Sequence, residues 1–318
     1  MVTVAPAPAR TVSARAHAKI NLDLRVLGTR PDGFHELRTV FQALALHDTV
    51  ECVPRPGPLS IECDAPGVPL DGSNLIWRAA EALWRVAGRE GPVTGVCLRL
   101  HKRIPLQGGL GGGSSDAAAT LRVLAKAWRL VVSPGQLAEM ASSIGSDVPF
   151  FLAGGTALGL GRGDEIYPLV DMPRHWVVLL VPGFGVSTAD AYGWYDAERD
   201  SGGRDQVREA QFVPGPWPSR AAQMINDLEA PIARHHPEID QMKAVLRRYG
   251  AAASAMSGSG STVYGLFQKK ADATTASEQL AGSGWRVLVT ESLGRVAYAR
   301  LSRPTLLRLA DAHNSRLQ

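Results

Sequence analysis

A run of glycines lies directly before a predicted helix. Residues 107–121 read QGGLGGGSSDAAATL, with five glycines between positions 108 and 113. The first N–H groups of a helix have no partner inside the helix, and the helix dipole adds partial positive charge there. Glycines let the backbone close on an anion with no Cβ in the way. The run therefore predicts a phosphate-binding loop, with Ser114 and Ser115 capping the helix and placed to contact phosphate or a cation.

Two familiar phosphate-binding patterns are excluded by the spacing. No lysine follows the glycines, as the P-loop pattern requires, and GGLGGGSS cannot be aligned with the dinucleotide pattern G-x-G-x-x-G. A flexible hinge or a plain turn is the alternative to an anion site. A helix terminus contributes only about 0.3–2 kcal/mol to the binding of an anion, so a phosphate site here needs further cationic groups.

A lysine and an asparagine share the polar face of a predicted strand. Residues 12–26, VSARAHAKINLDLRV, have apolar residues at every even position and mostly polar ones at the odd positions. Alternation of this length predicts a strand, or two strands with a bend, with one buried and one polar face. Lys19 and Asn21 lie two residues apart on the polar face. From this pattern alone, Lys19 is equally an ordinary exposed lysine.

An aspartate follows a well-delimited helix. In residues 133–145, Ser133 is a candidate N-cap, Pro134 and Gln136 occupy the first turn, and Gly145 ends the helix. Asp147 then lies on a short constrained turn before residues 148–166, which read as a loop leading into a strand. A turn aspartate is common for structural reasons alone.

The remaining patterns predict alternating helices and strands in two parts. A turn at 28–34 joins the first strand to a second, and 54–72 has little periodicity. We place a domain boundary near 165–170, which gives a disordered lead-in at 1–12, an N-terminal domain at 13–168 and a C-terminal domain at 169–318. The segment 196–220 reads as a polar surface loop or short helix. Further helices are predicted at 73–88, 115–130, within 224–251 and at 271–282, and further strands at 37–46, 95–105, 175–181, on both sides of a turn in 253–267, and finally at 285–293.

The composition is that of an ordinary globular protein. The chain has 318 residues, of which 45% are hydrophobic and 20% charged, and no apolar run approaches the ~18 residues of a membrane span. The N-terminus lacks the apolar core of a secretory signal. Cys52, Cys63 and Cys97 have neither metal-site nor redox spacing, which favours a reducing cytoplasm.

The charge balance is mildly basic. A formal net charge of +4 is compatible with a nucleic-acid partner, but the basic residues are scattered and aromatic residues make up only 6%. A small positive excess also suits an enzyme that handles phosphates. We therefore expect neither a nucleic-acid nor a membrane partner, and the sequence does not indicate an oligomeric state.

Four stretches resemble a known kinase family. PLQGGLGGGSSDAAATL (105–121) is similar to the ATP loop of the superfamily of galactokinase, homoserine, mevalonate and phosphomevalonate kinases. Its expanded glycine run resembles one branch, the 4-diphosphocytidyl-2-C-methyl-D-erythritol kinases. AKINLDLRVLGTRPDGFHEL (18–37), GSDVPFF (145–151) and MSGSGSTVYGLF (256–267) resemble further signatures of that branch, in the same order. Two departures are Phe34, where the branch has tyrosine, and Gln107, where glycine or alanine is usual.

The resemblance implies a fold and a reaction. The fold would be α+β, with an N-terminal domain like domain 2 of ribosomal protein S5, a ferredoxin-like C-terminal domain, and the active site in the cleft between them. The reaction would transfer the γ-phosphoryl group of ATP, bound with Mg²⁺, to the 2-hydroxyl of 4-(cytidine 5'-diphospho)-2-C-methyl-D-erythritol. That step belongs to the non-mevalonate route to isoprenoid precursors.

The resemblance also implies roles for individual residues. Asp147 would be the catalytic base, and Lys19 would hold it ionised and orient the hydroxyl. Ser115 is a possible Mg²⁺ contact. ATP would contact Asn74, Leu75, Lys102, Pro105, Gly108, Gly109, Leu110, Gly111, Gly112, Gly113, Ser114 and Ser115. The cytidine substrate would contact Asn21, Phe34 and Tyr192 (which would stack on the cytosine), His35 (which would hydrogen-bond to it), Thr188, Ser257, Gly258 and Gly260.

Two other functions on the same fold remain open. The first is another small-molecule kinase of the superfamily, acting on homoserine or mevalonate; RPDGFHE (30–36), which resembles the cytidine-site signature, argues against it. The second is a non-catalytic ATP-binding sensor, against which the presence of both Lys19 and Asp147 weighs.

Overall fold

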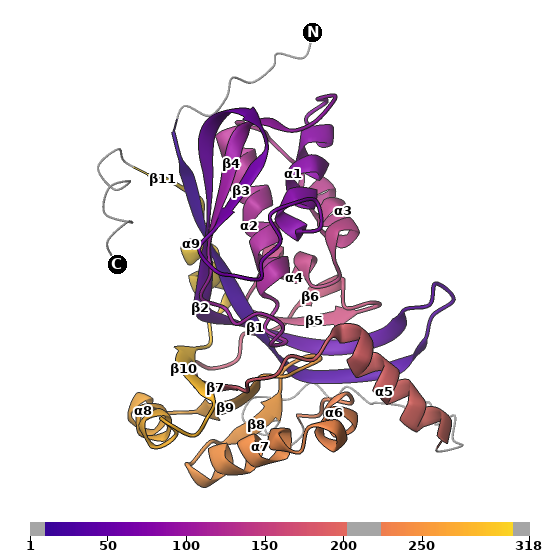
Figure 1. The fold of residues 1–318 in the computed structure, drawn as a ribbon, viewed down its shortest axis with the longest axis vertical. Helices are drawn as coiled ribbons and strands as arrows, with labels where there is room; N and C mark the ends of the chain where they lie inside the picture. The colour runs from indigo at the N-terminus through magenta and orange to yellow at the C-terminus, as the bar shows by residue number, and fades with distance from the viewer. Residues whose placement is uncertain (1–9, 202–223, 308–318) are drawn as a thin grey trace.

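Two β-sheets, each covered by helices, make up the structure (Figure 1). This computed structural model describes residues 10–201 and 224–307. The larger sheet has seven strands in the order β11-β1-β2-β4-β3, with β5 paired to β2 and β6 to β5, and the smaller has the order β10-β7-β9-β8. The strands are β1 (Val12–Thr29), β2 (His35–Pro58), β3 (Ser60–Cys63), β4 (Thr94–His101), β5 (Thr156–Leu160), β6 (Glu165–Pro168), β7 (Trp176–Val181), β8 (Ala253–Met256), β9 (Val263–Phe267), β10 (Arg286–Glu291) and β11 (Thr305–Leu306). The helices are α1 (Leu75–Val86), α2 (Gly112–Ala127), α3 (Pro134–Ile144), α4 (Val148–Ala153), α5 (Thr188–Ser201), α6 (Glu229–His235), α7 (Glu238–Arg248), α8 (Lys270–Gln279) and α9 (Arg295–Leu301).

The long hairpin β1–β2 joins the two layers. The predicted strand at 12–26 is confirmed as part of β1, which pairs antiparallel with β2 around the predicted turn. Its even-numbered apolar residues enter three core clusters in succession as the strand crosses from one layer to the other. Lys19 and Asn21 on the polar face are also buried, so Lys19 is not an ordinary exposed lysine. The second layer covers that face, so the polar side chains must find partners inside the protein.

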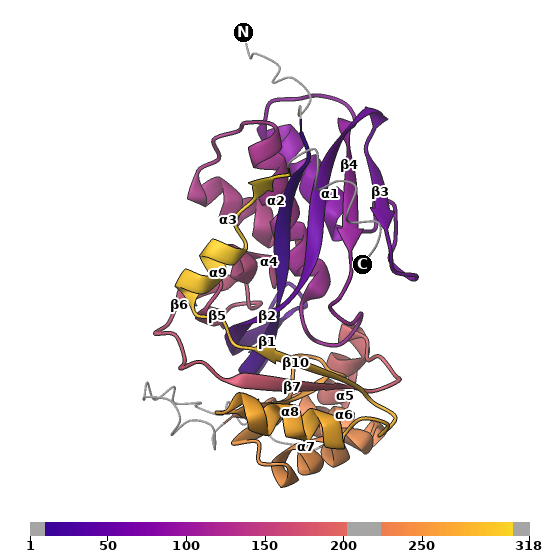
Figure 2. The ribbon, with the colours of Figure 1, turned by 90° about the vertical axis from the view of Figure 1, so that its left-hand side faces the viewer.

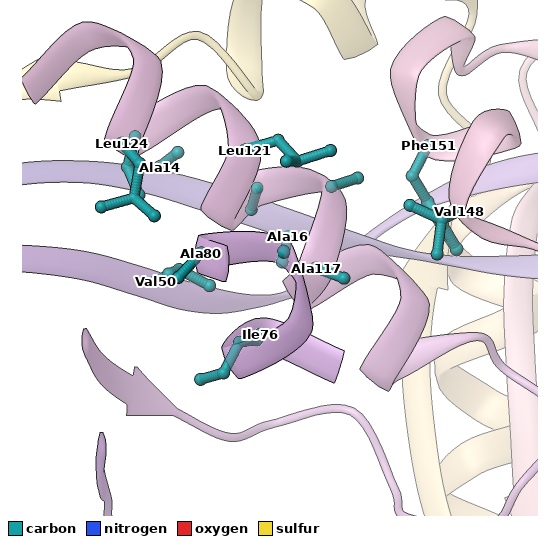
Figure 3. Packing of buried hydrophobic residues seen from close by; sticks show 14 of the residues in the cluster. Ala14, Ala16, Val50, Ile76, Ala80, Ala117, Leu121, Leu124, Val148 and Phe151 are labelled. Atoms are coloured by element: carbon teal, nitrogen blue, oxygen red, sulfur yellow. The ribbon is translucent and has the colours of Figure 1, made fainter. Parts of the chain in front are cut away.

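The first core lies between the large sheet and helices α1, α2 and α4 (Figure 3). Leu121 and Leu124 of α2 are buried in this core together with residues of β1 and β2. A capping box at Ser133 starts α3, as predicted. Helix α4 was not predicted, since its six residues, mostly apolar, read as a loop and strand, and β3 was not predicted in the weakly periodic segment 54–72.

The smaller sheet is buried on both faces. Val177 and Leu179 of β7 face the hairpin β1–β2, while the alternating Val178 and Leu180 face helices α7 and α8. This period-two split is what a central strand between two apolar layers requires. None of the helices in residues 10–201 and 224–307 is both long and apolar enough to cross a membrane.

The end of the chain returns to the first layer. Helix α9 and strand β11 lie beside the large sheet (yellow in Figure 2), and Val12 of β1 pairs with Leu306 of β11. Tyr298 of α9 is fully buried in the first core, where its hydroxyl donates to the carbonyl oxygen of Phe151 at 2.6 Å. Strand 285–293 was predicted to be the last element and 169–318 to be one domain. The first expectation is wrong, because α9 and β11 follow that strand. The limits 169–318 stay a prediction, although α9 and β11 pack on the N-terminal part.

Other domain limits stay predictions. Residues 1–9 of the predicted lead-in lie outside the described residues, and Val12 already belongs to β1. Of the predicted polar segment 196–220, the first residues continue α5 to Ser201, and 202–220 lie outside the described part of the chain.

A buried histidine two residues before Lys19 makes the fold sensitive to acid. His17 Nδ1 lies 3.1 Å from the carbonyl oxygen of Leu44, and its ring centroid lies 5.3 Å from that of His47 and 5.4 Å from that of Tyr298. Its Nε2 has no hydrogen-bond partner among the described residues. Burial, aided by the charge of nearby His47, lowers the pKa of His17 to about 3.

The pKa shift of His17 gives a signed prediction for stability. Between about pH 6.5, the ordinary imidazole pKa, and about 3 the unfolded chain binds a proton that the folded chain excludes. The stabilisation from neutral His17 is therefore complete above this window and falls by about 1.4 kcal/mol per pH unit as the pH drops through it. We expect denaturant unfolding between pH 7.5 and 5 to show a steeper loss of stability in the wild type than in His17→Gln. Equal slopes in the two proteins would contradict the assignment.

Candidate active site

A cavity of about 790 Å³ lies between the two layers, within the size range of small-molecule sites. Its walls come from the hairpin β1–β2, the glycine loop, the turn before α4, the start of α5 and the turn between β8 and β9. Most of the predicted site residues line it: Lys19, Asn21, Phe34, His35, Leu75, Lys102, Pro105, Gly108, Gly109, Leu110, Gly111, Gly112, Gly113, Ser114, Asp147, Thr188, Tyr192, Gly258 and Gly260.

Lys19 and Asp147 form an ion pair in this cavity. Lys19 Nζ lies 3.3 Å from Asp147 Oδ2 and donates a 2.7 Å hydrogen bond to Asn21 Oδ1. The amide of Asn21 in turn donates to Thr39 Oγ1 at 2.7 Å. The side chain of Lys19 is 4% exposed and that of Asp147 is 32% exposed. The lysine is thus fixed from behind, while the carboxylate remains open to the cavity.

The local backbone explains how the pair forms. The register of β1 against β2 shifts between His17 and Lys19, so the regular pairing of the two strands is interrupted next to the lysine. The backbone N–H of Lys19 donates to the carbonyl oxygen of Leu110, which ties the strand to the glycine loop. Asp147 occupies the N-cap position of α4 but makes no capping hydrogen bond, so its carboxylate is available to Lys19 and to a ligand.

The glycine loop needs glycine at two positions in particular. Gly109 and Gly111 have φ of +71° and +70°, the left-handed region that other residues seldom adopt. A Cβ on Gly109 would lie 2.0 Å from the carbonyl oxygen of Ser257, and one on Gly111 would lie 2.7 Å from the ring of Phe151. The loop is therefore in backbone contact with the opposite layer.

Helix α2 starts three residues earlier than expected. Gly111 is its N-cap and Gly112 its first residue, so the prediction that Ser114 and Ser115 cap the helix is wrong. The first backbone bond of the helix runs from Ser115 N–H to the carbonyl oxygen of Gly111. The N–H groups of Gly112, Gly113 and Ser114 lie before it, where a helix has no internal acceptors. An anion at this end of the cavity would meet these three donors.

The turn between β8 and β9 fastens the glycine loop. Ser257 Oγ donates to the carbonyl oxygen of Gly109 at 2.9 Å, and the N–H of Thr262 donates to that of Gly108 at 3.3 Å. Ser257 is fully buried and does not line the cavity, whereas Gly258, Ser259 and Gly260 of this turn do. The amide of Asn226 supports the turn by donating to the carbonyl oxygens of Met256 and Gly258.

Aromatic side chains gather at the other end of the cavity. The rings of His35 and Tyr192 stack with centroids 4.5 Å apart and planes 19° apart. Phe34 is 52% exposed, and the guanidinium carbon of Arg162 lies 5.2 Å from its ring centroid. Tyr192 thus stacks on His35 here, whereas the resemblance predicted that Phe34 and Tyr192 face each other across a base. Thr188 Oγ1 lies 3.4 Å from Ser259 Oγ at the cavity edge.

Two predicted ATP contacts, Lys102 and Asn74, have structural partners, and a third, Ser115, is buried away from the cavity. Lys102 lines the cavity, but its Nζ is held by Asp48 and Asp116 at 2.5 and 2.7 Å. Burial raises the pKa of Asp116 well above its usual range, against the effect of Lys102. Asn74 caps α1 by accepting from the N–H of Ile76 and does not line the cavity. Ser115 does not line it either, and its buried Oγ has no partner among the described residues.

Sequence reasoning missed several side chains at the site. Arg162 lies in the glycine-rich turn between β5 and β6, which carried no chemical pattern. Asp196 follows Tyr192 by one helical turn of α5, and its Oδ1 lies 2.9 Å from His35 Nε2. Helical spacing from Tyr192 was the one signal that could have found it. Gln107 has a φ of +52°, a conformation that costs a residue with a Cβ about 1–2 kcal/mol and that glycine adopts without this cost.

Comparison with known proteins identifies the family of the chain. The family descriptions "GHMP kinases N terminal domain" and "GHMP kinases C terminal" match residues 74–155 and 217–285. A 4-diphosphocytidyl-2-C-methyl-D-erythritol kinase of Solibacter usitatus is 44% identical over 267 residues, which cover 82% of this chain and 83% of that protein. The protein of the same name from Pelotomaculum thermopropionicum is 41% identical and covers 88% of this chain and 98% of its own.

Solved structures give the same result. A crystal structure of 4-(cytidine 5'-diphospho)-2C-methyl-D-erythritol kinase matches with a TM-score of 0.70 and 32% identity, covering 89% of this chain and 99% of the other. A homoserine kinase from Cytophaga hutchinsonii shares the fold, with a TM-score of 0.66 at 17% identity, covering 94% of this chain and 97% of the other. The predicted α+β kinase fold is confirmed by these matches. With identities of 41–44% over more than four fifths of its length, the chain belongs to the 4-diphosphocytidyl-2-C-methyl-D-erythritol kinases, a family of GHMP kinases.

Proposed function

We propose that this protein uses ATP to phosphorylate the 2-hydroxyl of 4-(cytidine 5'-diphospho)-2-C-methyl-D-erythritol. The products would be the 2-phosphate and ADP, within the non-mevalonate route to isoprenoid precursors. The observation that carries the proposal is the Lys19–Asp147 pair, 3.3 Å apart, in one cavity with the glycine loop and the aromatic end. The glycine loop on one side of this pair suits the phosphates of a phosphoryl donor. The aromatic end on the other side suits the nucleobase of a nucleotide-linked alcohol.

The residues at the glycine loop fit the phosphates of ATP. A side chain at Gly109 or Gly111 would fill the loop, and three N–H groups at the start of α2 lie nearby. Leu75 and Pro105 supply an apolar wall at the same end of the cavity. When bound, Mg²⁺–ATP supplies the phosphoryl group and neutralises part of its negative charge. Ser115 offers a buried oxygen of the kind that Mg²⁺ prefers, and its contact with the ion stays a prediction.

The protein's own contribution is positioning and charge. Phosphoryl transfer needs little covalent chemistry from the protein, so alignment of the hydroxyl is the main task. Asp147 would accept the proton of the 2-hydroxyl at its open carboxylate. Lys19, held by Asn21, would keep that carboxylate ionised and orient the hydroxyl beside it. Since Lys19 is almost fully buried, its charge acts in a medium of low polarity, where it is strong.

The aromatic end would bind the cytosine. Phe34 and Tyr192 offer ring faces, and His35 offers a ring nitrogen. Phe34 has no hydroxyl, so it can stack on a base but cannot donate a hydrogen bond from its ring, unlike the tyrosine usual in the family. Arg162, packed on the ring of Phe34, places a positive charge at the cavity wall.

We also infer a cytoplasmic location, because Cys52, Cys63 and Cys97 are all unpaired.

A substrate comparison tests the proposal. The wild-type enzyme is to be supplied with Mg²⁺–ATP and, separately, with the cytidine substrate, homoserine or mevalonate. We expect ADP formation well above the ATPase background with the cytidine substrate alone, and a new phosphomonoester signal in the ³¹P spectrum of the product. Comparable turnover of homoserine or mevalonate would favour another kinase of the superfamily. ATP binding without ADP formation on any of the three alcohols would favour a sensor.

A further inference from the structure

A carboxylate fixes one nitrogen of the histidine at the aromatic end. Asp196 Oδ1 lies 2.9 Å from His35 Nε2, although 161 positions separate the two residues. Tyr192 covers one face of the imidazole, and Tyr195 meets it edge-on with centroids 6.4 Å apart. These three residues of α5 are spaced i, i+3 and i+4, so they lie on one face of the helix. One helical face therefore surrounds a single imidazole ring.

The opposite side of α5 holds that face in place. Trp194 stacks on His235 of α6 with centroids 4.1 Å apart and planes 18° apart. Glu198 of α5 also forms an ion pair with Arg234 of α6, but this pair is largely exposed and contributes little to the position of the helix. With the helix fixed in this way, Asp196 stays beside His35 even though its own side chain is 45% exposed.

The contact determines which nitrogen of His35 carries the proton. An ionised carboxylate only accepts hydrogen bonds, so Nε2 must donate and therefore bears hydrogen. In a neutral imidazole the other nitrogen, Nδ1, is then an acceptor. None of the residues in the described ranges hydrogen-bonds to Nδ1, and His35 lines the cavity. The site thus presents an acceptor nitrogen to whatever base enters it.

An acceptor at this position distinguishes between pyrimidines. Cytosine carries an amino group at C4, which donates hydrogen bonds, whereas uracil carries a carbonyl oxygen there, which only accepts. We propose that Asp196 is a positioning residue that keeps Nδ1 of His35 unprotonated and so makes the site select a 4-aminopyrimidine over a 4-oxopyrimidine. The inference rests on the proposed function, since it takes His35 as the residue that meets the base. With uracil, two acceptors would face each other and one group would stay unsatisfied.

The expected effect is a loss of selectivity. One neutral hydrogen bond corresponds to about a tenfold difference in affinity. In Asp196→Ala and Asp196→Asn the imidazole is free to carry its proton on Nδ1, because alanine offers no acceptor and an amide satisfies either tautomer. We expect the ratio of kcat/KM for the cytidine substrate to that for its uridine counterpart to fall by about tenfold in both variants. The lower ratio should come mainly from a higher KM for the cytidine substrate. Asp196→Glu should recover part of the wild-type ratio.

A control on the same helix separates this role from a structural one. Glu198→Gln breaks the pair with Arg234 without touching His35, so its ratio should equal that of the wild type. The tautomer can be read directly from the ¹⁵N shifts of histidine-labelled enzyme at about pH 8, with His35→Gln to assign the signal. We expect Nε2 of His35 to be protonated and Nδ1 unprotonated in the wild type, and a mixture in Asp196→Ala.

The outcomes are distinguishable from failure of the proposed function. If wild-type enzyme does not phosphorylate the cytidine substrate, the proposed function is wrong, whatever the tautomer. If it does, but selectivity is the same in wild type, Asp196→Ala and Asp196→Asn, the role of Asp196 is overturned. A wild-type His35 protonated at Nδ1, alone or together with Nε2, would overturn it as well, and this measurement does not depend on whether any Asp196 variant folds.

Discussion

Asp147→Asn should reduce kcat by about 10²–10⁴-fold, the usual contribution of a general base, with little change in stability. Asparagine has nearly the same shape as aspartate but cannot take up the proton of the substrate hydroxyl. The fold should tolerate the change because the Asp147 side chain makes no capping hydrogen bond and is 32% exposed. Steady-state kinetics together with thermal unfolding would measure both quantities.

Two further variants sharpen the test of Asp147. Asp240→Asn makes the same chemical change on the exposed surface of α7, where we expect normal turnover. Lys19→Ala should also lower kcat strongly, and the double variant should be little worse than either single one, because residues that act as a unit have non-additive effects. Near-normal turnover in Asp147→Asn would remove the assignment of this carboxylate as the base.

Gly109→Ala is expected to weaken ATP binding by at least about tenfold and to lower kcat as well. The new Cβ would lie 2.0 Å from the carbonyl oxygen of Ser257, so the backbone must move. Alanine in the left-handed region costs about 1–2 kcal/mol in addition. Since the loop also ends in the N-cap of α2, its displacement would misplace the N–H groups offered to the phosphates.

Calorimetric titration with an ATP analogue would measure this effect apart from turnover. Gly135→Ala in the first turn of α3 is the matched control, since a Cβ there meets no atom within 4 Å and the backbone is helical. We expect Gly135→Ala to bind the analogue normally. If Gly109→Ala were to bind with unchanged affinity, the glycine loop would not be the phosphate cradle.

The periodic spacing of apolar residues and the helix-capping residues predicted much of the fold correctly. Strand β1, helix α3 with its capping box, and the strand–turn–strand of 253–267 could be read from spacing and caps alone. The elements missed are short or lack a side-chain cap. Helix α4 has six residues with little polar–apolar contrast, and α9 has seven residues behind a glycine N-cap.

The site was only partly predictable for a different reason. Alternation in β1 placed Lys19 and Asn21 on one face, but a single sequence does not show whether a polar face meets water or another layer. The pairing of Lys19 with Asp147 joins a strand to a turn 128 positions away, and that of His35 with Asp196 joins segments 161 positions apart. The extra glycines predicted an anion site, yet the N-cap fell on Gly111 because the backbone turn, not a serine side chain, begins the helix.

The contact between Tyr298 and Phe151 has a consequence for how the protein is made. Phe151 lies on α4, the helix that begins directly after Asp147. Tyr298, whose hydroxyl donates to the carbonyl oxygen of Phe151, is 147 residues further along the chain. At about 5–20 residues per second, a ribosome needs about 7–30 s to reach that tyrosine after it has synthesised the phenylalanine. Throughout this time the carbonyl oxygen of Phe151 lacks its tyrosine partner, although α2 and α3 can already pack on α4. The packing around this helix can therefore be completed only after residue 298 has been synthesised.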